Sequence, residues 1–464
     1  MLKVFGVVVA AVLVSTKGTT GGTMTSLMSH DRDDEFSVAE ERQPLDVNAL
    51  LAAAKGAPPM ICALAAQSVG NNWGGWSDAP STPLKSVSSS GYDYDFRNDA
   101  LSSADVQTLL QSLASEDPCV REMSVRVVTR RKSETVVSGL ISRLTSESPS
   151  LREVASLGLG LAHSPASIDP LIRTLRDATP GVRANSAWAL CRMEAGRALT
   201  PLLGLFNDDA ENVRVAAVGA VGHLDSTRSV PTLVRVVKQD PSPLVRRVAA
   251  WALGQLEASE AVATLSSVLS QDKDAQVREM AAWALGSIES ATGLQALLAA
   301  ARRDDNDRVR ETAVWALGQI EDQSTADELG SIASSDKSAR VRGTAAWAIG
   351  QIRGDGGHAP SGLLVLLKDP DDDARLKAAW ALGQIGDAAA LPAIRTALQS
   401  EKDEQVNRAL VRAMMKSGER SEAVFTQLLN SSDARVRESA VRGLAGRESF
   451  NPWPWPWPRP RPFP

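Results

Sequence analysis

A dipeptide, an apolar residue followed by arginine, recurs at nearly constant spacing along this chain and constrains its fold more than any other feature. Successive arginines are 30 to 33 residues apart, and Asn407 takes the arginine position in one unit. Eleven units therefore fit between residues 101 and 446, and a fixed period of this length is typical of a repeat architecture. The recurring arginines are Arg121, Arg152, Arg183, Arg214, Arg246, Arg278, Arg310, Arg342, Arg375 and Arg437.

Each unit has two segments with helical periodicity. In one unit, residues 261–270 carry apolar side chains at the i, i+3 and i+4 spacing of an amphipathic helix. Residues 276–288 carry a second apolar stripe and contain the motif A-A-W-A-L-G, which recurs in several units. A single helical hairpin cannot bury both of its apolar faces, so neighbouring hairpins must stack. The sequence thus predicts an all-α fold, an α-solenoid of about eleven two-helix repeats in a right-handed superhelix.

The pattern V-R-x-x-A-A-W-A-L-G, as at residues 277–286, resembles the HEAT-repeat superfamily, and in particular its short-unit subgroup named after phycobilisome lyases. The resemblance covers the repeat region, about three quarters of the chain. It implies that the second helix of each unit lines the concave surface. It indicates an architecture and no particular activity.

The recurring arginine is predicted to join neighbouring repeats. An arginine fork can bridge a turn carboxylate or the carbonyls at a helix end in the adjacent unit. Acidic residues stand in the turns ahead of many of these arginines, namely Asp117, Asp209, Asp240, Asp274, Asp307, Asp372 and Asp433. The expected structural ladder consists of Arg183, Arg214, Arg246, Arg278, Arg310, Arg342 and Arg375.

A tryptophan follows the arginine by five residues in six units, and the residue four positions later shares its helix face. Plotted at 100° per residue, this face lies away from the core stripe. The candidate binding groove therefore comprises Trp188, Trp251, Gln255, Trp283, Trp315, Gln319, Trp347, Gln351, Trp380 and Gln384. Trp-x-x-x-Gln is similar to the Trp-x-x-x-Asn array with which armadillo-repeat proteins hold extended peptides. Packing of the rings against the next repeat is the other interpretation, and the two can coexist.

Composition argues against several functional classes. The formal net charge is −5, whereas nucleic-acid-binding domains are usually basic, so no nucleic-acid partner is expected. The four histidines are far apart, which leaves little material for metal or triad chemistry. We therefore expect no catalytic residues, no metal and no cofactor, and predict a scaffold that binds a protein or an extended peptide.

An enzyme built on the same repeats is the alternative. Deoxyhypusine hydroxylase has similar repeats with His-Glu pairs directly after the V-R dipeptide, but here no histidine occupies those positions. Phycobilin lyase subunits resemble the chain throughout the repeats, and this likeness is mainly one of scaffold. A repeat-based lyase or an oxidoreductase of the hydroxylase type is thus the competing prediction.

The amino-terminal region indicates export. Lys3 precedes an eleven-residue apolar run that suits a signal peptide, expected at residues 1–24. The protein is then periplasmic or secreted, and cytoplasmic if the start is misassigned. Residues 25–100 are expected to have little order apart from a short helix pair at 46–69 and a linker. Cys62, Cys119 and Cys191 are expected as buried free thiols, although export would allow some of them to pair.

The carboxyl-terminal residues 447–464 form a tail in which proline alternates with other residues and forbids both helix and sheet. An extended, polyproline-like strip would offer its side chains to a membrane interface or to an aromatic groove of a partner. A tail without a dedicated ligand is the other interpretation. The candidate interaction residues are Trp453, Trp455, Trp457, Arg459 and Arg461.

Overall fold

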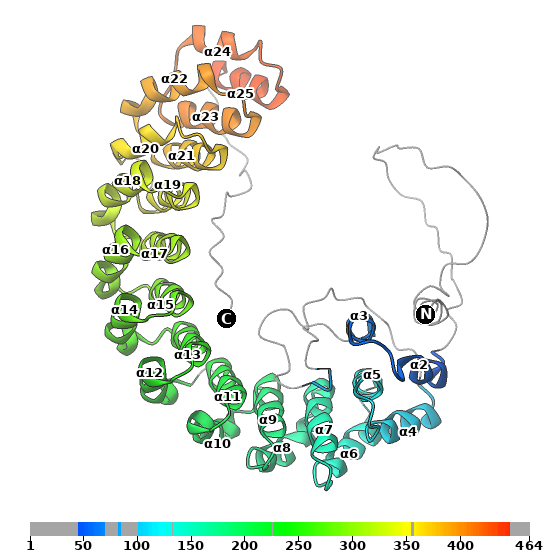
Figure 1. The fold of residues 1–464 in the computed structure, drawn as a ribbon. Helices are drawn as coiled ribbons and strands as arrows, with labels where there is room; N and C mark the ends of the chain where they lie inside the picture. The colour runs from blue at the N-terminus through cyan, green and yellow to red at the C-terminus, as the bar shows by residue number, and fades with distance from the viewer. Residues whose placement is uncertain are drawn as a thin grey trace, which may run out of the picture. The chain divides into compact units, whose positions relative to one another are not determined.

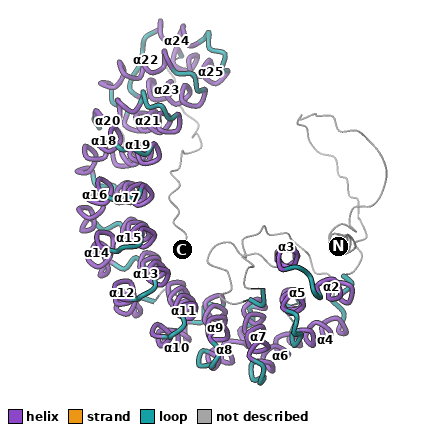
Figure 2. The backbone as a smooth tube through the Cα atoms, viewed as in Figure 1, coloured by secondary structure: helices purple, strands orange, loops and turns teal. Residues whose placement is uncertain are grey.

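The computed structural model describes six stretches of the chain, residues 45–69, 82–84, 101–131, 133–224, 226–353 and 357–445. All regular structure in these stretches is helical, as Figure 2 shows. The predicted signal peptide, most of the linker and the whole tail with Trp453, Trp455, Trp457, Arg459 and Arg461 lie outside the described residues. Within those residues, no helix combines the length and the apolar character that a membrane span needs.

The chain divides into two compact units, with the boundary between Ala220 and Val221. Unit 1 begins with two short helices, α2 (Val47–Ala54) and α3 (Pro59–Val69). Its repeats consist of the helix pairs α4 (Ser103–Ser112) and α5 (Pro118–Val128), α6 (Glu134–Arg143) and α7 (Pro149–Ala162), α8 (Ile168–Thr174) and α9 (Pro180–Arg192), and α10 (Leu199–Gly204) and α11 (Glu211–His223).

Unit 2 continues the same alternation. Its pairs are α12 (Val230–Gln239) and α13 (Pro243–Gln255), α14 (Val262–Gln271) and α15 (Ala275–Ile288), α16 (Leu294–Arg303) and α17 (Asp307–Ile320), α18 (Ala326–Ser335) and α19 (Ala339–Arg353), α20 (Ser361–Leu366) and α21 (Asp372–Ile385), α22 (Leu391–Ser400) and α23 (Glu404–Lys416), and α24 (Glu422–Leu428) and α25 (Ala434–Leu444). The described residues of the two units thus hold eleven pairs, which confirms the predicted repeat number and the α-solenoid class.

The second helix of each pair begins at a cap that the sequence encodes. Asp274 is the N-cap of α15, and its side chain accepts hydrogen bonds from the backbone N–H groups of Gln276 and Val277. Asn306 caps α17 in the same way. Such caps satisfy N–H groups that have no partner inside the helix. Three of the acidic residues in the turns ahead of the arginines, Asp117, Asp274 and Asp433, therefore cap their own helices.

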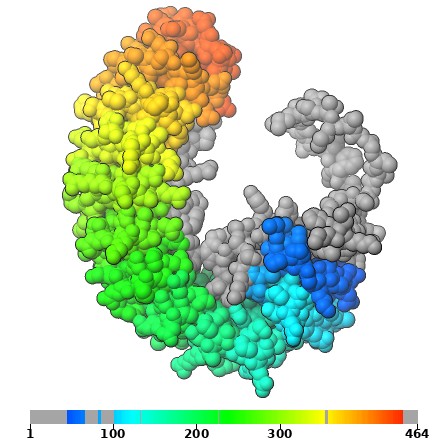
Figure 3. All heavy atoms as spheres, in the orientation of Figure 1, coloured from blue at the N-terminus to red at the C-terminus, as the bar shows by residue number. Residues whose placement is uncertain are grey.

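In unit 2 the two helices of each pair lie in separate layers. The second helices, from α13 to α23, pack side by side and form the inner, concave layer, while the first helices from α12 to α22 form the outer layer (Figure 1). The predicted core stripes are buried: Leu265 and Val277 have 0% exposure and Leu285 has 1%. Neighbouring repeats of unit 2 consequently pack directly against one another (Figure 3).

The helix pair predicted at 46–69 is present and covers the first repeat. Cys62 of α3 and Cys119 of α5 form a disulfide whose Cα atoms are 5.9 Å apart. Leu50 and Leu51 pack against the buried cluster around this disulfide. The expectation of buried free thiols is therefore wrong for these two cysteines, because the fold brings together residues that are 57 positions apart.

Candidate functional site

In seven repeats the arginine belongs to a ladder of ion pairs that joins successive repeats. The Nε and Nη2 of Arg278 donate to the two carboxylate oxygens of Asp304 at 2.8 and 3.0 Å, and Nη1 donates to the carbonyl of Asp272 at 2.9 Å. The same two-pronged contact recurs for Arg152–Asp177, Arg183–Asp208, Arg246–Asp272, Arg310–Asp336, Arg342–Asp369 and Arg375–Glu401. Arg214 donates to the carbonyls of Asp208 and Asp209 in its own turn.

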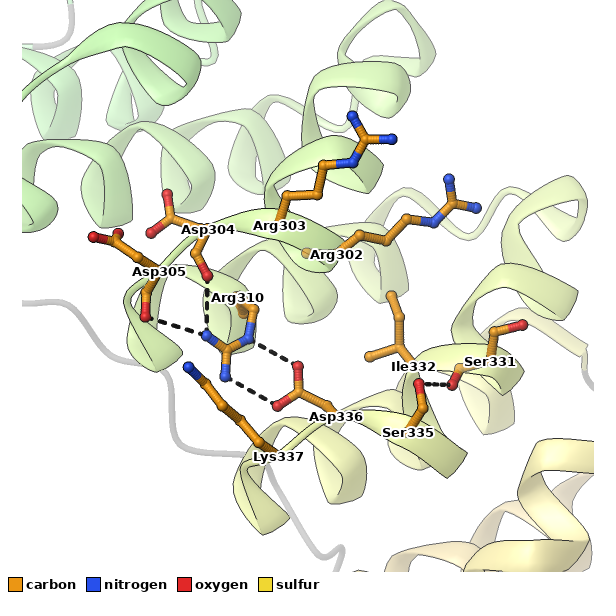
Figure 4. Close-up of a pocket in the computed structure, with 11 residues that line it drawn as sticks. Arg302, Arg303, Asp304, Asp305, Arg310, Ser331, Ile332, Ser335, Asp336 and Lys337 are labelled. Atoms are coloured by element: carbon orange, nitrogen blue, oxygen red, sulfur yellow. Dashed lines mark hydrogen bonds and ion pairs between the residues drawn. The ribbon is translucent and has the colours of Figure 1, made fainter.

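One rung of the ladder borders a surface pocket of about 610 Å³. Figure 4 shows Arg310 between the carbonyls of Asp304 and Asp305 and the carboxylate of Asp336, whereas Arg303 extends away from it. The Arg310 side chain is only 3% exposed and that of Asp336 is 9% exposed. Arg310, the two carbonyls and the Asp336 carboxylate satisfy one another, so this side of the pocket is a structural joint between repeats.

Ionisation of the ladder carboxylates is favoured. Burial opposes the charged form of Asp272, but hydrogen bonds from Arg246 and from the Asp274 backbone outweigh it and lower the pKa of the carboxyl. The same balance lowers the pKa of Asp177, Asp208, Asp304, Asp369 and Glu401. The ladder therefore holds permanent ion pairs at neutral pH.

The sequence analysis missed the acceptors of this ladder. They stand directly after the first helix of the next repeat, as Asp272 follows α14 and Asp304 follows α16. The missed signal is a carboxylate that recurs 25 to 27 residues after each arginine. Each of these carboxylates also accepts a backbone N–H two residues later, so it organises its own turn.

The tryptophan of each repeat packs on a glycine of the preceding repeat. A Cβ placed on Gly318 would lie 2.8 Å from Cζ3 of Trp347 and 2.9 Å from Cβ of Ala348, so only hydrogen fits there. Equivalent contacts join Gly160–Trp188, Gly222–Trp251, Gly254–Trp283, Gly286–Trp315 and Gly350–Trp380. The glycine of A-A-W-A-L-G thus receives the indole that follows it in the stack.

This packing corrects the predicted row of open indoles. Trp188, Trp251 and Trp347 are buried, with 6%, 5% and 0% exposure. They are not available to line a groove, because each ring packs on a glycine in the last turn of the preceding second helix. Trp283, Trp315 and Trp380 are half-buried and retain an accessible part.

The glutamines four residues after these tryptophans remain accessible. Gln255 and Gln384 are exposed, and Gln319 and Gln351 are half-buried. Among the described residues none of these four amides makes a hydrogen bond. Each lies on a second helix of unit 2, so the inner layer presents the same unpaired amide at repeated intervals (Figure 1).

The same position holds other side chains toward the start of the array. Arg192 lies over the Trp188 ring, 5.0 Å from its centroid, in a cation–π contact. His223 is exposed and its ring centroid is 4.8 Å from that of Trp251. Arginine and histidine there contact an indole, whereas Gln255, Gln319, Gln351 and Gln384 have no hydrogen bond among the described residues.

An acidic side chain stands one turn before two of the three half-buried tryptophans. Glu279 precedes Trp283 and Glu311 precedes Trp315 by four residues, so each pair shares a helix face. Burial raises the pKa of both glutamates, while nearby arginines oppose the shift. Arg340 approaches Glu311 to 3.7 Å. On α17 the inner face therefore carries Glu311, Trp315 and Gln319 on successive turns.

Groups suited to chemistry are sparse in the described residues. They contain no cluster of three or more His, Cys, Asp and Glu that is arranged to hold a metal ion. Burial raises the pKa of the Cys191 thiol to about 12, so it stays protonated and is a poor nucleophile. The features that the structure brings together are a structural ladder and a surface for contact.

Comparison with known proteins agrees with this architecture. A family model described as HEAT repeats matches residues 106–191, 168–243, 230–318, 294–361 and 359–445. No curated protein matches the sequence.

Solved structures share the fold at low sequence identity. Importin beta is 14% identical, with a TM-score of 0.58 over 86% of this chain and 62% of its own. Kap95p, whose binding induces the switch loops of RanGDP to adopt the GTP-bound conformation, is 15% identical, with a TM-score of 0.54 over 74% of this chain and 56% of its own. The CpcE–CpcF complex of phycocyanin lyase from Nostoc is 19% identical, with a TM-score of 0.32 over 55% of this chain and 98% of its own.

Proposed function

The chain belongs to the HEAT-repeat family, and on that basis we propose that it is a non-enzymatic scaffold that binds an extended polypeptide along the inner layer of unit 2. The single observation that carries this proposal is a set of glutamine amides without hydrogen bonds among the described residues on four of the second helices of unit 2, Gln255, Gln319, Gln351 and Gln384. A primary amide both donates and accepts hydrogen bonds. It therefore suits the N–H and C=O groups of a peptide backbone.

The spacing of the amides fits such a ligand. Packed helices are about 8–10 Å apart, and an extended chain advances about 3.3 Å per residue. One amide would then meet every third residue of the ligand. Ser287 takes the glutamine position in α15, so the row is interrupted by a shorter side chain at that helix.

The half-buried tryptophans would form the floor between the amides. Trp283 and Trp315 each keep one part packed on a glycine and another part accessible. Partly exposed indoles are frequent anchors of protein interfaces. The buried Trp251 and Trp347 instead hold the repeats at the spacing that the amides require.

We also propose that the protein is exported to the periplasm or beyond the cell. The apolar run after Lys3 supports this, and so does the disulfide between Cys62 and Cys119, because structural disulfides persist mainly in oxidising compartments. Fractionation of a bacterial host that expresses the full chain tests it. A mature protein in the periplasm or medium, shortened by about 20 residues, is expected, and full-length protein retained in the cytoplasm would refute export.

Site-specific photo-crosslinking tests the proposed groove. We would place p-benzoylphenylalanine at position 319 on the inner layer and, as the control, at the exposed Gln271 on the outer layer. Polypeptide adducts should form at position 319 and be absent at position 271, because only the inner amide row is proposed to contact the ligand. Equal adducts at both positions would contradict a specific inner groove.

A matched set of alanine variants provides a second test of the proposed groove. Replacing the four inner glutamines should weaken binding of the crosslinked polypeptide by about tenfold or more, since several hydrogen bonds of about 1 kcal/mol each are lost. Replacing four exposed glutamines of the outer helices, Gln239, Gln271, Gln295 and Gln399, should leave binding unchanged. Both variants should keep the helical circular dichroism of the parent, because none of the eight residues is buried.

A further inference from the structure

The last helix of the stack exposes side chains at positions that other repeats bury. Aligned on the V-R dipeptide, Val441 of α25 corresponds to Ala282 of α15, and Leu444 corresponds to Leu285. Val441 is 55% exposed and Leu444 is 44% exposed, whereas Ala282 and Leu285 are 0% and 1% exposed. In α23 the same positions hold Val411 at 1% and Met414 at 0%.

Val441 and Leu444 therefore lie on the face of α25 that corresponds to the surface through which earlier repeats pack on the next repeat. In each earlier repeat of unit 2 the following second helix covers the corresponding residues, as α25 packs on α23. Repeat proteins need end repeats with a polar outer face, because an apolar end is open to water or to association. At the other end of the chain, α2 and α3 cover the first repeat and are joined to it by a disulfide. The carboxyl-terminal end has no such cover among the described residues.

We propose that residues 446–464 of the same chain fold back onto α25 and cap this face. The segment starts directly after the exposed helix and carries Trp453, Trp455, Trp457 and Phe463. A polyproline-like chain rises about 3.1 Å per residue, so the first tryptophan reaches about 25 Å from Ala445. Helix α25 has 11 residues and is about 16 Å long at 1.5 Å per residue, which places its whole face within reach.

The chemistry of the segment also suits a helix face. Proline has no N–H group, so a chain with proline at every second position brings few backbone donors that must be satisfied. A helix face likewise offers side chains and no free backbone groups. In the proposed cap, the apolar rings of residues 446–464 pack against Val441 and Leu444. They cover the face that a following repeat covers elsewhere in unit 2. The cap would leave the inner amide row of unit 2 unobstructed, so it is independent of the proposed peptide groove.

Hydrogen–deuterium exchange on the full chain tests the cap. In the parent protein the amides of α25 should be protected, and the triple variant Trp453→Ser, Trp455→Ser, Trp457→Ser should exchange about tenfold faster there. The three substitutions lie outside the repeats, so folding of the stack is retained. Val365→Ser, which changes an apolar residue of α20 that is 58% exposed, is the control and should leave α25 unchanged.

A peptide added in trans completes the test. A synthetic peptide of residues 446–464, added to a chain that stops at Ala445, should restore the protection of α25, and the peptide with serine at the three tryptophans should not. Equal exchange of α25 in the parent and in the triple variant would overturn the proposal. A dimer of the parent that dissociates on Leu444→Ser, measured by light scattering, would also overturn it, because a second copy would then be the occupant.

Discussion

Replacing Arg310 by alanine tests whether the arginine ladder holds the repeats together. The guanidinium is 3% exposed and makes two hydrogen bonds to Asp336 and two to the backbone carbonyls of Asp304 and Asp305. Its loss leaves the Asp336 carboxylate, 9% exposed, with only the N–H of Ser338 as a partner in the ladder. Removing one member of a buried ion pair costs about 3–5 kcal/mol, and we expect a loss in the lower half of that range.

Urea unfolding followed by circular dichroism, with hydrogen exchange to localise the effect, measures this loss. The control is Arg303→Ala, because Arg303 is exposed at the end of the neighbouring helix α16 and has no ion pair among the described residues. Surface changes of this kind shift stability by less than about 0.5 kcal/mol. Arg310→Ala should therefore lower the unfolding midpoint clearly and the control should not.

The double variant Arg310→Ala, Asp336→Ala separates the ion pair from simple loss of packing. If the cost comes from an uncompensated buried carboxylate, removing that carboxylate recovers part of it. The double variant should then be more stable than the sum of the single changes by about 2 kcal/mol. Additive effects, or an Arg310→Ala variant as stable as the Arg303→Ala control, would refute the reasoning.

Three further predictions concern packing, pH and the disulfide. Gly318→Ala should destabilise unit 2 by about 1–3 kcal/mol in thermal unfolding, because its Cβ would press on Trp347. The matched Gly383→Ala, whose Cβ would meet Ala413 at 3.6 Å, should be neutral or stabilising; equal effects would contradict the Trp–Gly contact. Six ladder carboxylates have lowered pKa values in the folded state, so their stabilisation is complete above their ordinary pKa of about 4 and is lost as pH falls through the folded values. The melting temperature should hence fall steeply below about pH 4, and a flat profile down to pH 2 would count against the ladder. Cys62→Ser with Cys119→Ser should cost about 4 kcal/mol for a loop of this length, seen as a lower melting temperature that reductant reproduces in the parent; an unchanged melting temperature would show that the link is dispensable.

Much of this architecture could be predicted from particular residues. The spacing of the V-R dipeptide gave the length and number of the repeats. The apolar stripes that contain Leu265 and Val277 indicated which helix faces are buried. The role of the arginines as a joint between repeats was also foreseen, because a fork of donors at each turn has few other uses. The acceptors of these arginines were not predicted. The sequence offers several carboxylates in each turn, and only the tertiary structure shows that the arginine binds the one after the first helix.

The binding surface was less predictable. Trp315 and Trp347 stand in nearly identical motifs, yet one is half-buried and the other is fully buried. Helical periodicity gives the direction of a side chain, whereas exposure depends on how closely the neighbouring repeat approaches. The glutamines remain accessible one turn beyond the tryptophans, at the end of each helix, where Gln255 and Gln384 are exposed.

Local patterns alone determined that the chain forms paired helices, how many pairs there are and where each begins and ends, because capping and amphipathic periodicity act over a few residues. Contacts between residues far apart in the sequence were decided only by the tertiary structure. They include the pairing of Cys62 with Cys119, the burial of three indoles against glycines and the open face at Val441 and Leu444. The physical reason is that these outcomes depend on the volume and position of a neighbouring repeat, which no single stretch of sequence specifies.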